Sequence, residues 1–229
     1  MYLNQKTMKT YKVIFLDTET TGICDMRTPY NEETLRNTWP YITQFAYQVC
    51  HITEDLLTST QEAIKVHKIK PVYSPDLYSE EAMLKTGISY NELLNGDEIV
   101  PILHDFISEL NTADFVVAHN TTFDMKVIKA EFLRHGIDQH MRVCPWIDTM
   151  YHGNTFCNLR NSRGGRKFPT LSELYKKITD SFPPVAHKAD ADLTSLKVCF
   201  FGLIKNNILT QDRIANRIAS HVSSNNVFE

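Results

Sequence analysis

The feature that most constrains this chain is a short apolar segment near the N-terminus that runs directly into two acidic residues. Residues 13–16 read Val-Ile-Phe-Leu, and Asp17, Thr18, Glu19 and a Thr-Thr-Gly turn follow. A short apolar run bounded by turn residues predicts a strand that is buried on both faces. Because side chains alternate along a strand, we expect Asp17 and Glu19 to point to one side and Thr18 to the other.

The two acids have a simple interpretation and a chemical one. In the simple interpretation they form a solvated, acidic end of a strand. In the chemical one they lie close together at the end of a buried strand, where two carboxylates repel each other. Such a pair is tolerated mainly when a cation lies between the carboxylates or when one of them takes up a proton. The pattern of two acids does not decide between these interpretations, so the rest of the chain must.

The composition is that of an ordinary globular protein, and it limits how the chain could hold an anionic substrate. The formal net charge of −3 provides no overall attraction for nucleic acid, so an anionic substrate would need local basic groups or metal ions. The five cysteines are scattered without a Cys-x-x-Cys pair, which favours a reducing cytoplasm. No apolar run approaches the ~20 residues of a membrane span, and residues 1–12 lack the apolar core of a signal peptide.

The apolar pattern predicts strands first, then alternating helices and strands, and then helices. The expected elements of the first half are a loop at 23–41, strands at 42–52 and 58–70, and helices at 75–86, 89–96 and 99–110. Those of the second half are a strand at 115–118, a helix ending at Gly136, a strand at 143–150, a loop at 152–169, and helices opening at Thr170, Asp190 and Thr210. This order indicates one α/β domain over residues 1–229, with a core at about 12–205, a mixed sheet and helices on both faces.

Two later segments also place acids or imidazoles at the ends of elements. Residues 119–124 read His-Asn-x-x-Phe-Asp where a buried strand turns into a helix, and Asp124 would lie in the first turn of that helix. The simplest role of an acid there is to offset the helix dipole. Residues 187–192 read His-x-x-Asp-x-Asp where the penultimate helix begins, and such groups are common on protein surfaces. Each segment alone is therefore weak evidence for a site.

Together the three motifs have a specific meaning. The order D-x-E-T-T-G, H-N-x-x-F-D and H-x-A-x-x-D resembles the DEDDh 3′–5′ exonucleases, which include the proofreading epsilon subunit of bacterial DNA polymerase III and ribonuclease T. The resemblance extends from Lys12 to about Leu203. Residues 86–89 stand where the family has its H-G-I-T turn, and residues 147–149 where it has its I-D-T strand.

The chain departs from the family pattern in ways that affect the choice of substrate more than the chemistry. The loop after Gly22 is longer than usual, a basic insertion follows Asp148, and Thr86 replaces the histidine of the family's turn. A tyrosine-type member would carry tyrosine four residues before the last aspartate, where this chain has Lys188, so the histidine type is the better match. Asp190 competes for the last acidic position, but the family spacing favours the aspartate two residues later.

The resemblance implies a ribonuclease-H-like fold, with a five-stranded mixed sheet and an acidic site at its edge. The implied ligands of two Mg²⁺ or Mn²⁺ ions are Asp17, Glu19, Asp124 and Asp192, because hard divalent cations prefer carboxylate oxygen. By analogy Asp17 would contact both ions, Glu19 and Asp192 would complete one site, and Asp124 would act on the other. His187 is the implied general base, because an imidazole with an ordinary pKa of ~6.5 accepts a proton near neutral pH.

Several further residues are candidates for holding a 3′-terminal nucleotide. Phe123 would stack on the terminal base, although packing in the core is its simpler role. The backbone of Thr20, Thr21 and Gly22 would approach the terminal sugar, because glycine permits close contact, and Ile88 would press on the base. His119 and Asn120 are candidates for substrate contact as well, although shaping the turn is the simpler role.

A basic run follows later in the chain and has two interpretations. Residues 160–167 carry four cations with no acid between them: Arg160, Arg163, Arg166 and Lys167. Most runs of this kind are solvated loops. Beside a nuclease site, the same cations would follow the phosphates of a bound strand.

The sequence therefore predicts a metal-dependent 3′–5′ exonuclease that releases nucleoside monophosphates from single-stranded ends. We expect DNA rather than RNA as its substrate and a DNA polymerase or repair protein as a candidate partner. The alternatives are an exoribonuclease that trims RNA and an inactive module that only binds nucleic acid. Nothing in the sequence reads a 2′-hydroxyl, so DNA and RNA are not separated on that ground. The inactive module is disfavoured because the four acids and the histidine are all present.

Overall fold

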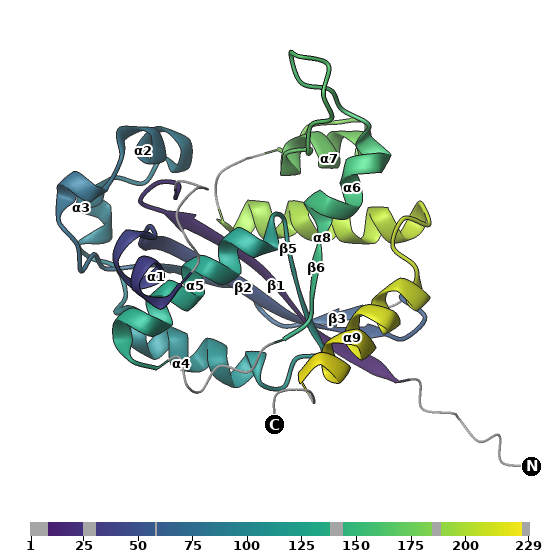
Figure 1. The fold of residues 1–229 in the computed structure, drawn as a ribbon, viewed down its shortest axis with the longest axis horizontal. Helices are drawn as coiled ribbons and strands as arrows, with labels where there is room; N and C mark the ends of the chain where they lie inside the picture. Colours follow the sequence, from purple (N-terminus) through teal and green to yellow (C-terminus); the bar gives the residue numbers. More distant parts are fainter. Residues whose placement is uncertain (1–8, 25–30, 58, 138–143, 185–188, 226–229) are drawn as a thin grey trace, which may run out of the picture.

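A mixed sheet lies between two layers of helices in the computed structural model of this chain (Figure 1). The structure describes residues 9–24, 31–57, 59–137, 144–184 and 189–225. The strands are β1 (Thr10–Thr20), β2 (Ile42–Thr53), β3 (Ser59–Gln61), β4 (Lys65–Lys68), β5 (Phe115–Ala118) and β6 (Trp146–Asp148). The fold is α/β, as the sequence predicts.

The sheet has the order β3-β2-β1-β5-β6, and β4 also pairs with β2. Strands β1 and β2 are antiparallel along their whole length, whereas β1 with β5 and β5 with β6 are parallel. Because β1 occupies one edge of β2, the short strands β3 and β4 share the other edge. The sheet is therefore five strands wide, and the carboxyl ends of β1, β5 and β6 lie at the same edge, where ligand sites of open α/β sheets form.

Helices cover both faces of the sheet. The helical elements are α1 (Glu32–Thr38), the 3-10 helix η1 (Pro75–Leu77), α2 (Glu80–Thr86), α3 (Tyr90–Leu93), α4 (Ile99–Leu110), α5 (Thr121–His135), α6 (Thr149–Cys157), α7 (Leu171–Thr179), α8 (Ala189–Lys205) and α9 (Gln211–Asn225). Buried residues of α1, α4 and α5 form one hydrophobic cluster with the sheet, and those of α7, α8 and α9 form a second cluster on the opposite face. No helix in the described part of the chain is both long enough and apolar enough to cross a membrane.

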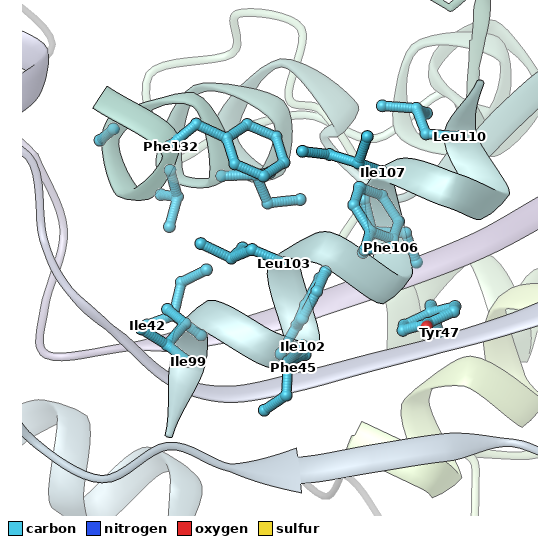
Figure 2. Packing of buried hydrophobic residues seen from close by; sticks show 14 of the residues in the cluster. Ile42, Phe45, Tyr47, Ile99, Ile102, Leu103, Phe106, Ile107, Leu110 and Phe132 are labelled. Carbon is cyan, nitrogen blue, oxygen red and sulfur yellow. The ribbon is translucent and has the colours of Figure 1, made fainter. Parts of the chain in front are cut away.

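The first cluster shows why the helix with the clearest apolar pattern forms as predicted. Helix α4 buries the side chains that recur three and four residues apart, and it presents them to β2 and α5 (Figure 2). Phe106 lies edge-on to Phe45 and to Tyr47, with ring centroids 5.1 and 5.3 Å apart. Edge-to-face pairs of this kind add ~0.5–1.5 kcal/mol to the free energy gained from burial.

Strand β1 contributes alternate residues to the two clusters. Ile14 and Leu16 belong to the cluster that contains α5, whereas Val13 and Phe15 belong to the cluster that contains α8. All four are completely buried, so the strand is apolar on both faces, as predicted. This alternation determines which face each residue at the end of β1 occupies.

Two segments that we expected to be loops contain helices. Helix α1 lies within residues 23–41, and its N-terminus is capped by Asn31, whose side chain accepts a hydrogen bond of 2.9 Å from the amide of Thr34. Helix α6 occupies the start of residues 152–169 and is capped by Asp148. The predictions were wrong here because both helices are short and bury few residues, so they leave little apolar periodicity in the sequence.

The strand expected over residues 58–70 is divided into β3 and β4. They pair with different parts of β2, β3 with residues 50–52 and β4 with residues 44–47. Both are edge strands with mostly exposed side chains, so tertiary pairing and not burial determines their ends.

Candidate active site

Three of the predicted acids meet at the carboxyl end of β1. The alternation along the strand places Asp17 and Glu19 on the face that α8 covers, and Asp192 lies in the first turn of α8. One carboxylate oxygen from each residue can be chosen so that all three lie within 4.8 Å of one another. Glu19 and Asp192 are buried. The fold thus brings acids from the two ends of the chain into one cluster.

The fourth predicted acid reaches β1 from the other layer of helices. Asp124, in the first turn of α5, is buried. Its Oδ1 accepts a hydrogen bond of 3.1 Å from the Thr18 amide and one of 2.7 Å from the Thr18 hydroxyl. Thr18 therefore points toward α5, as the alternation predicts. Asp124 fixes the backbone of β1 at the position between Asp17 and Glu19.

The carboxylates are in an environment that disfavours their charged forms. Burial raises the pKa of Asp17 well above its ordinary value, and the negative charges of Asp124, Glu19 and Asp192 raise it further. Burial also raises the pKa of Asp124, to about 7, although the hydrogen bonds from Thr18 oppose this. The pKa of Glu19 is raised mainly by burial. The cluster thus holds more negative charge than its surroundings can stabilise.

These residues fit a divalent cation. Asp17 Oδ2 is buried and has no hydrogen-bond partner within the described part of the chain. An unpartnered buried carboxylate oxygen costs free energy, and a cation beside it would remove that cost. All the donors are carboxylate oxygens, which suit Mg²⁺ or Mn²⁺ better than a soft metal.

A cleft of about 460 Å³ opens beside Glu19. Its walls come from the end of β1, from residues 37–41 at the end of α1 and just before β2, from η1 and α2, and from Phe123 at the start of α5. Four residues that we predicted as substrate contacts line this cleft: Thr20, Thr21, Gly22 and Phe123. The Thr21 amide and carbonyl are both bonded within the protein, to Tyr41 and Ser79, so Thr21 gives the cleft its shape but no free backbone donor.

Three other predicted contacts are not among the residues that line the cleft. Ile88 is 5% exposed, and its carbonyl accepts a hydrogen bond from the hydroxyl of Tyr78. Both ring nitrogens of His119 form hydrogen bonds, one of 3.0 Å with the Thr149 hydroxyl and one of 2.9 Å with the Pro169 carbonyl. Asn120 adopts a left-handed conformation with φ of 75°, and its backbone amide donates a hydrogen bond to the carboxylate of Asp148. Their contacts within the protein show why none of the three lines the cleft.

The predicted basic run forms a hairpin between α6 and α7 that stands out from the body of the fold (Figure 1). It is closed by a hydrogen bond of 2.8 Å from the Asn161 amide to the Gly165 carbonyl and by a bridge between Arg160 and Arg166. The side chains of its three arginines are exposed. Lys167 differs, because its ammonium lies 2.6 Å from a carboxylate oxygen of Glu173.

His187 falls within residues 185–188, which lie outside the described residues. The prediction that it is the general base therefore stays a prediction. The helix that follows, α8, begins within one residue of the expected position.

Sequence reasoning missed the residues that hold the wall of the cleft at 37–41. Arg134, near the end of α5, donates hydrogen bonds to three carbonyls within residues 36–40 and lies 4.0 Å from the centre of the Tyr41 ring. Its guanidinium lies 2.8 Å from a carboxylate oxygen of Glu131, whose side chain is 1% exposed. The only sequence feature that pointed to Arg134 was its place as a basic residue near a helix C-terminus. Basic residues at such positions are usually exposed. Trp39 and Lys85, which line the cleft, were missed as well.

Comparisons with known proteins agree with this geometry. Residues 14–198 match the family model described as RNase T, exonuclease. Nothing among the curated protein sequences matched this chain.

Three similar solved structures illustrate the likeness. Exonuclease X in complex with 5′-overhanging duplex DNA is 18% identical, with a TM-score of 0.54, and the match covers 90% of this chain and 99% of that one. E. coli exonuclease I in complex with a dA16 oligonucleotide is 19% identical, with a TM-score of 0.61; the match covers 92% of this chain but only 43% of that one. A 3′-exonuclease that recognises the histone mRNA stem-loop is 14% identical, with a TM-score of 0.56 and coverage of 86% and 84%. At these identities the likeness shows the shared ribonuclease-H-like fold.

Proposed function

Because this chain belongs to the RNase T family of exonucleases, which hydrolyse phosphodiester bonds, we propose that it is a metal-dependent enzyme that removes nucleotides from single-stranded 3′ ends. The observation that carries the proposal is the convergence of Asp17, Glu19 and Asp192, with carboxylate oxygens within 4.8 Å of one another. This cluster lies beside a cleft of about 460 Å³, which is within the usual size range of small-ligand sites.

Each acid has a distinct part in the proposed chemistry. Two Mg²⁺ or Mn²⁺ ions would stabilise the charge that develops at phosphorus during an in-line displacement. Asp17 would contact both ions, Glu19 and Asp192 would hold one, and Asp124 would act on the other. The hydrogen bonds from Thr18 to Asp124 connect the end of β1 to α5, and they support the positions of Asp17 and Glu19 on either side of Thr18.

The cleft would hold the terminal nucleotide through shape and stacking. Phe123 is partly exposed, lines the cleft and lies 6.1 Å from the ring of Trp39. Base–aromatic stacking contributes ~1–3 kcal/mol per base and tolerates any sequence. Single-stranded DNA is the substrate that we propose, and a DNA polymerase or a repair protein is the proposed partner. RNA is the alternative substrate, because one of the similar structures recognises an RNA stem-loop.

The test is a degradation assay with 5′-labelled strands of matched sequence. Single-stranded DNA, duplex DNA and RNA are each incubated with Mg²⁺ or Mn²⁺ and, in parallel, with chelator. We expect a ladder that shortens from the 3′ end of single-stranded DNA and disappears with chelator. A ladder from RNA alone would support the exoribonuclease alternative. Strands that stay intact under every condition would indicate a module that binds without cutting.

Replacement of His187 by alanine tests the proposed general base. A general base contributes ~10²–10⁴-fold to the rate, so kcat should fall by about that factor while KM changes little. A base must be uncharged to accept a proton, so wild-type activity should rise with pH around ~6.5, and that rise should vanish in the variant. Lys188→Ala, a substitution at the next residue, serves as the control. An H187A enzyme with the wild-type rate and pH profile would contradict the assignment.

Neutralising the hairpin cations tests whether the hairpin contacts phosphates. Arg160, Arg163, Arg166 and Lys167 are replaced by glutamine together, and binding to a long single strand is measured at several salt concentrations. Each lost phosphate contact should reduce the slope of log K against log salt by ~0.7. Lys167 should contribute least, because Glu173 already neutralises it. An unchanged slope would show that the hairpin is only a solvated loop.

A further inference from the structure

Lys85 is a cation that lines the cleft beside the acidic cluster. It lies in the last turn of α2, and its side chain is exposed. The simplest role of a lysine there is to interact favourably with the helix dipole. However, Lys85 and Glu19 line the same cleft, so a cation and an acid of the cluster border the same space.

The charge of Lys85 is not neutralised by an ion pair. No carboxylate oxygen among the described residues lies within 4.0 Å of its ammonium, although Glu81, one helical turn earlier, also lines the cleft. Its positive charge instead interacts at longer range with the carboxylates of Asp17 and Glu19. Lys85 is thus a partial counter-ion that stays at a distance from the carboxylates.

Lys85 is also a polar side chain of α2 that is available to a ligand. The hydroxyl of Thr86 lines the cleft too, but it donates a hydrogen bond of 2.9 Å to the Ala82 carbonyl and accepts one from the Ile88 amide. The hydroxyl of Ser79 accepts a hydrogen bond from the Ala82 amide. An ammonium on a flexible stem has three donors and forms good contacts with phosphate as a point charge.

We propose that Lys85 binds an oxygen of the substrate phosphate that lies at the acidic cluster, and that it weakens divalent-ion binding until this phosphate arrives. The inference rests on the proposed function, because it requires a phosphodiester end in the cleft. Without substrate, the ammonium repels a divalent ion from Asp17 and Glu19. With substrate, the phosphate charge offsets that of the ammonium, and the repulsion ends. Ion binding and substrate binding therefore strengthen each other to the same extent.

The test measures two binding affinities and needs no turnover. In the absence of nucleic acid, Lys85→Met should bind Mn²⁺ about three- to tenfold more tightly than the wild type, because one nearby positive charge is lost. In chelator, the same variant should bind a single-stranded DNA oligomer about threefold or more weakly, since it lacks a phosphate contact. Lys85→Arg keeps the charge and should bind Mn²⁺ like the wild type.

Lys205→Met is the matched control, because this exposed lysine lies 13 residues along α8 from Asp192, or about 20 Å at the rise of an α-helix. Both of its affinities should equal those of the wild type. The inference requires the two changes in Lys85→Met to occur in opposite directions, and either affinity remaining at its wild-type value would overturn it. Failure of the proposed function would appear differently, as a wild-type protein that leaves every labelled strand intact.

Discussion

Replacing Asp17 by asparagine should abolish strand degradation and stabilise the metal-free protein. Asparagine has nearly the same shape but no charge, so it binds a divalent ion between itself and the neighbouring acids far more weakly. Loss of that ion removes several kcal/mol of transition-state stabilisation, which corresponds to a rate lower by about 10³-fold or more. The assay is the 5′-labelled single-strand ladder in Mg²⁺.

The gain in stability follows from the burial of the same side chain. Asp17 Oδ2 has no hydrogen-bond partner in the described part of the chain, and three other carboxylates act on Asp17. Removing an unpartnered buried charge should raise the free energy of unfolding by about 1–3 kcal/mol. Denaturant unfolding in chelator measures this difference. A substitution that removes activity while it stabilises the fold would show that the charge serves the site and not the structure.

The pH dependence of stability provides a second signature. The pKa of Asp17 is raised in the folded protein, as are those of Glu19 and Asp124, the last to about 7, whereas unfolded carboxyl groups titrate at about 4. The folded protein therefore binds more protons than the unfolded chain between these values. Metal-free wild-type stability should fall as pH rises from about 4 to about 7. The fall should be smaller in the variant and should be reversed by Mg²⁺ at pH 7.

Asp190→Asn is the matched control for this experiment. Asp190 lies in the same first turn of α8 as Asp192, but its side chain is exposed. It should retain wild-type activity within about twofold and wild-type stability within ~0.5 kcal/mol, as surface substitutions usually do. Full activity in Asp17→Asn, or loss of activity in Asp190→Asn alone, would show that the acidic cluster is not the site of reaction.

The acidic cluster was predictable because its residues follow strict local rules. Side chains alternate along a strand, so the positions of Asp17 and Glu19 on one face followed from the sequence alone. The apolar run before these two acids predicted a central strand. In an open α/β sheet, the carboxyl ends of such parallel strands lie at the edge of the sheet where the following helices begin. The proximity of Asp192 to these two acids could be predicted only from the order of the three motifs. No local rule brings the two ends of a chain together.

The cleft was predictable only in part, since its walls depend on contacts between distant segments. Ile88 matched a family turn, yet it packs in the core, and His119 uses one ring nitrogen to bond the start of α6 and the other to bond Pro169, just before α7. Neither outcome can be read from residue type or spacing. Trp39 lines the cleft because Arg134, far along the chain, binds the carbonyls around it. A charged residue reveals such a role only when its burial is known.

The wall of the cleft can be tested through that arginine. Replacing Arg134 by alanine leaves the buried carboxylate of Glu131 without its arginine partner, and it removes the donors to three carbonyls of residues 36–40. Breaking a buried ion pair on one side costs about 3–5 kcal/mol, so the free energy of unfolding should fall by that amount. Arg36→Ala removes a partly exposed arginine paired with an exposed glutamate and should cost less than ~1 kcal/mol.

The double variant Glu131→Gln/Arg134→Ala separates charge from lost hydrogen bonds. The introduced glutamine would still accept the hydrogen bond that the Ile42 amide gives to Glu131 at 3.1 Å, but it carries no charge. If the unpaired charge of Glu131 causes most of the loss in unfolding free energy, the double variant should be more stable than Arg134→Ala. Burial raises the pKa of Glu131 and the arginine opposes that effect, so the loss in Arg134→Ala should also be greater at pH 8 than at pH 5. Equal losses at both pH values would mean that the carbonyl contacts, and not the ion pair, hold this wall in place.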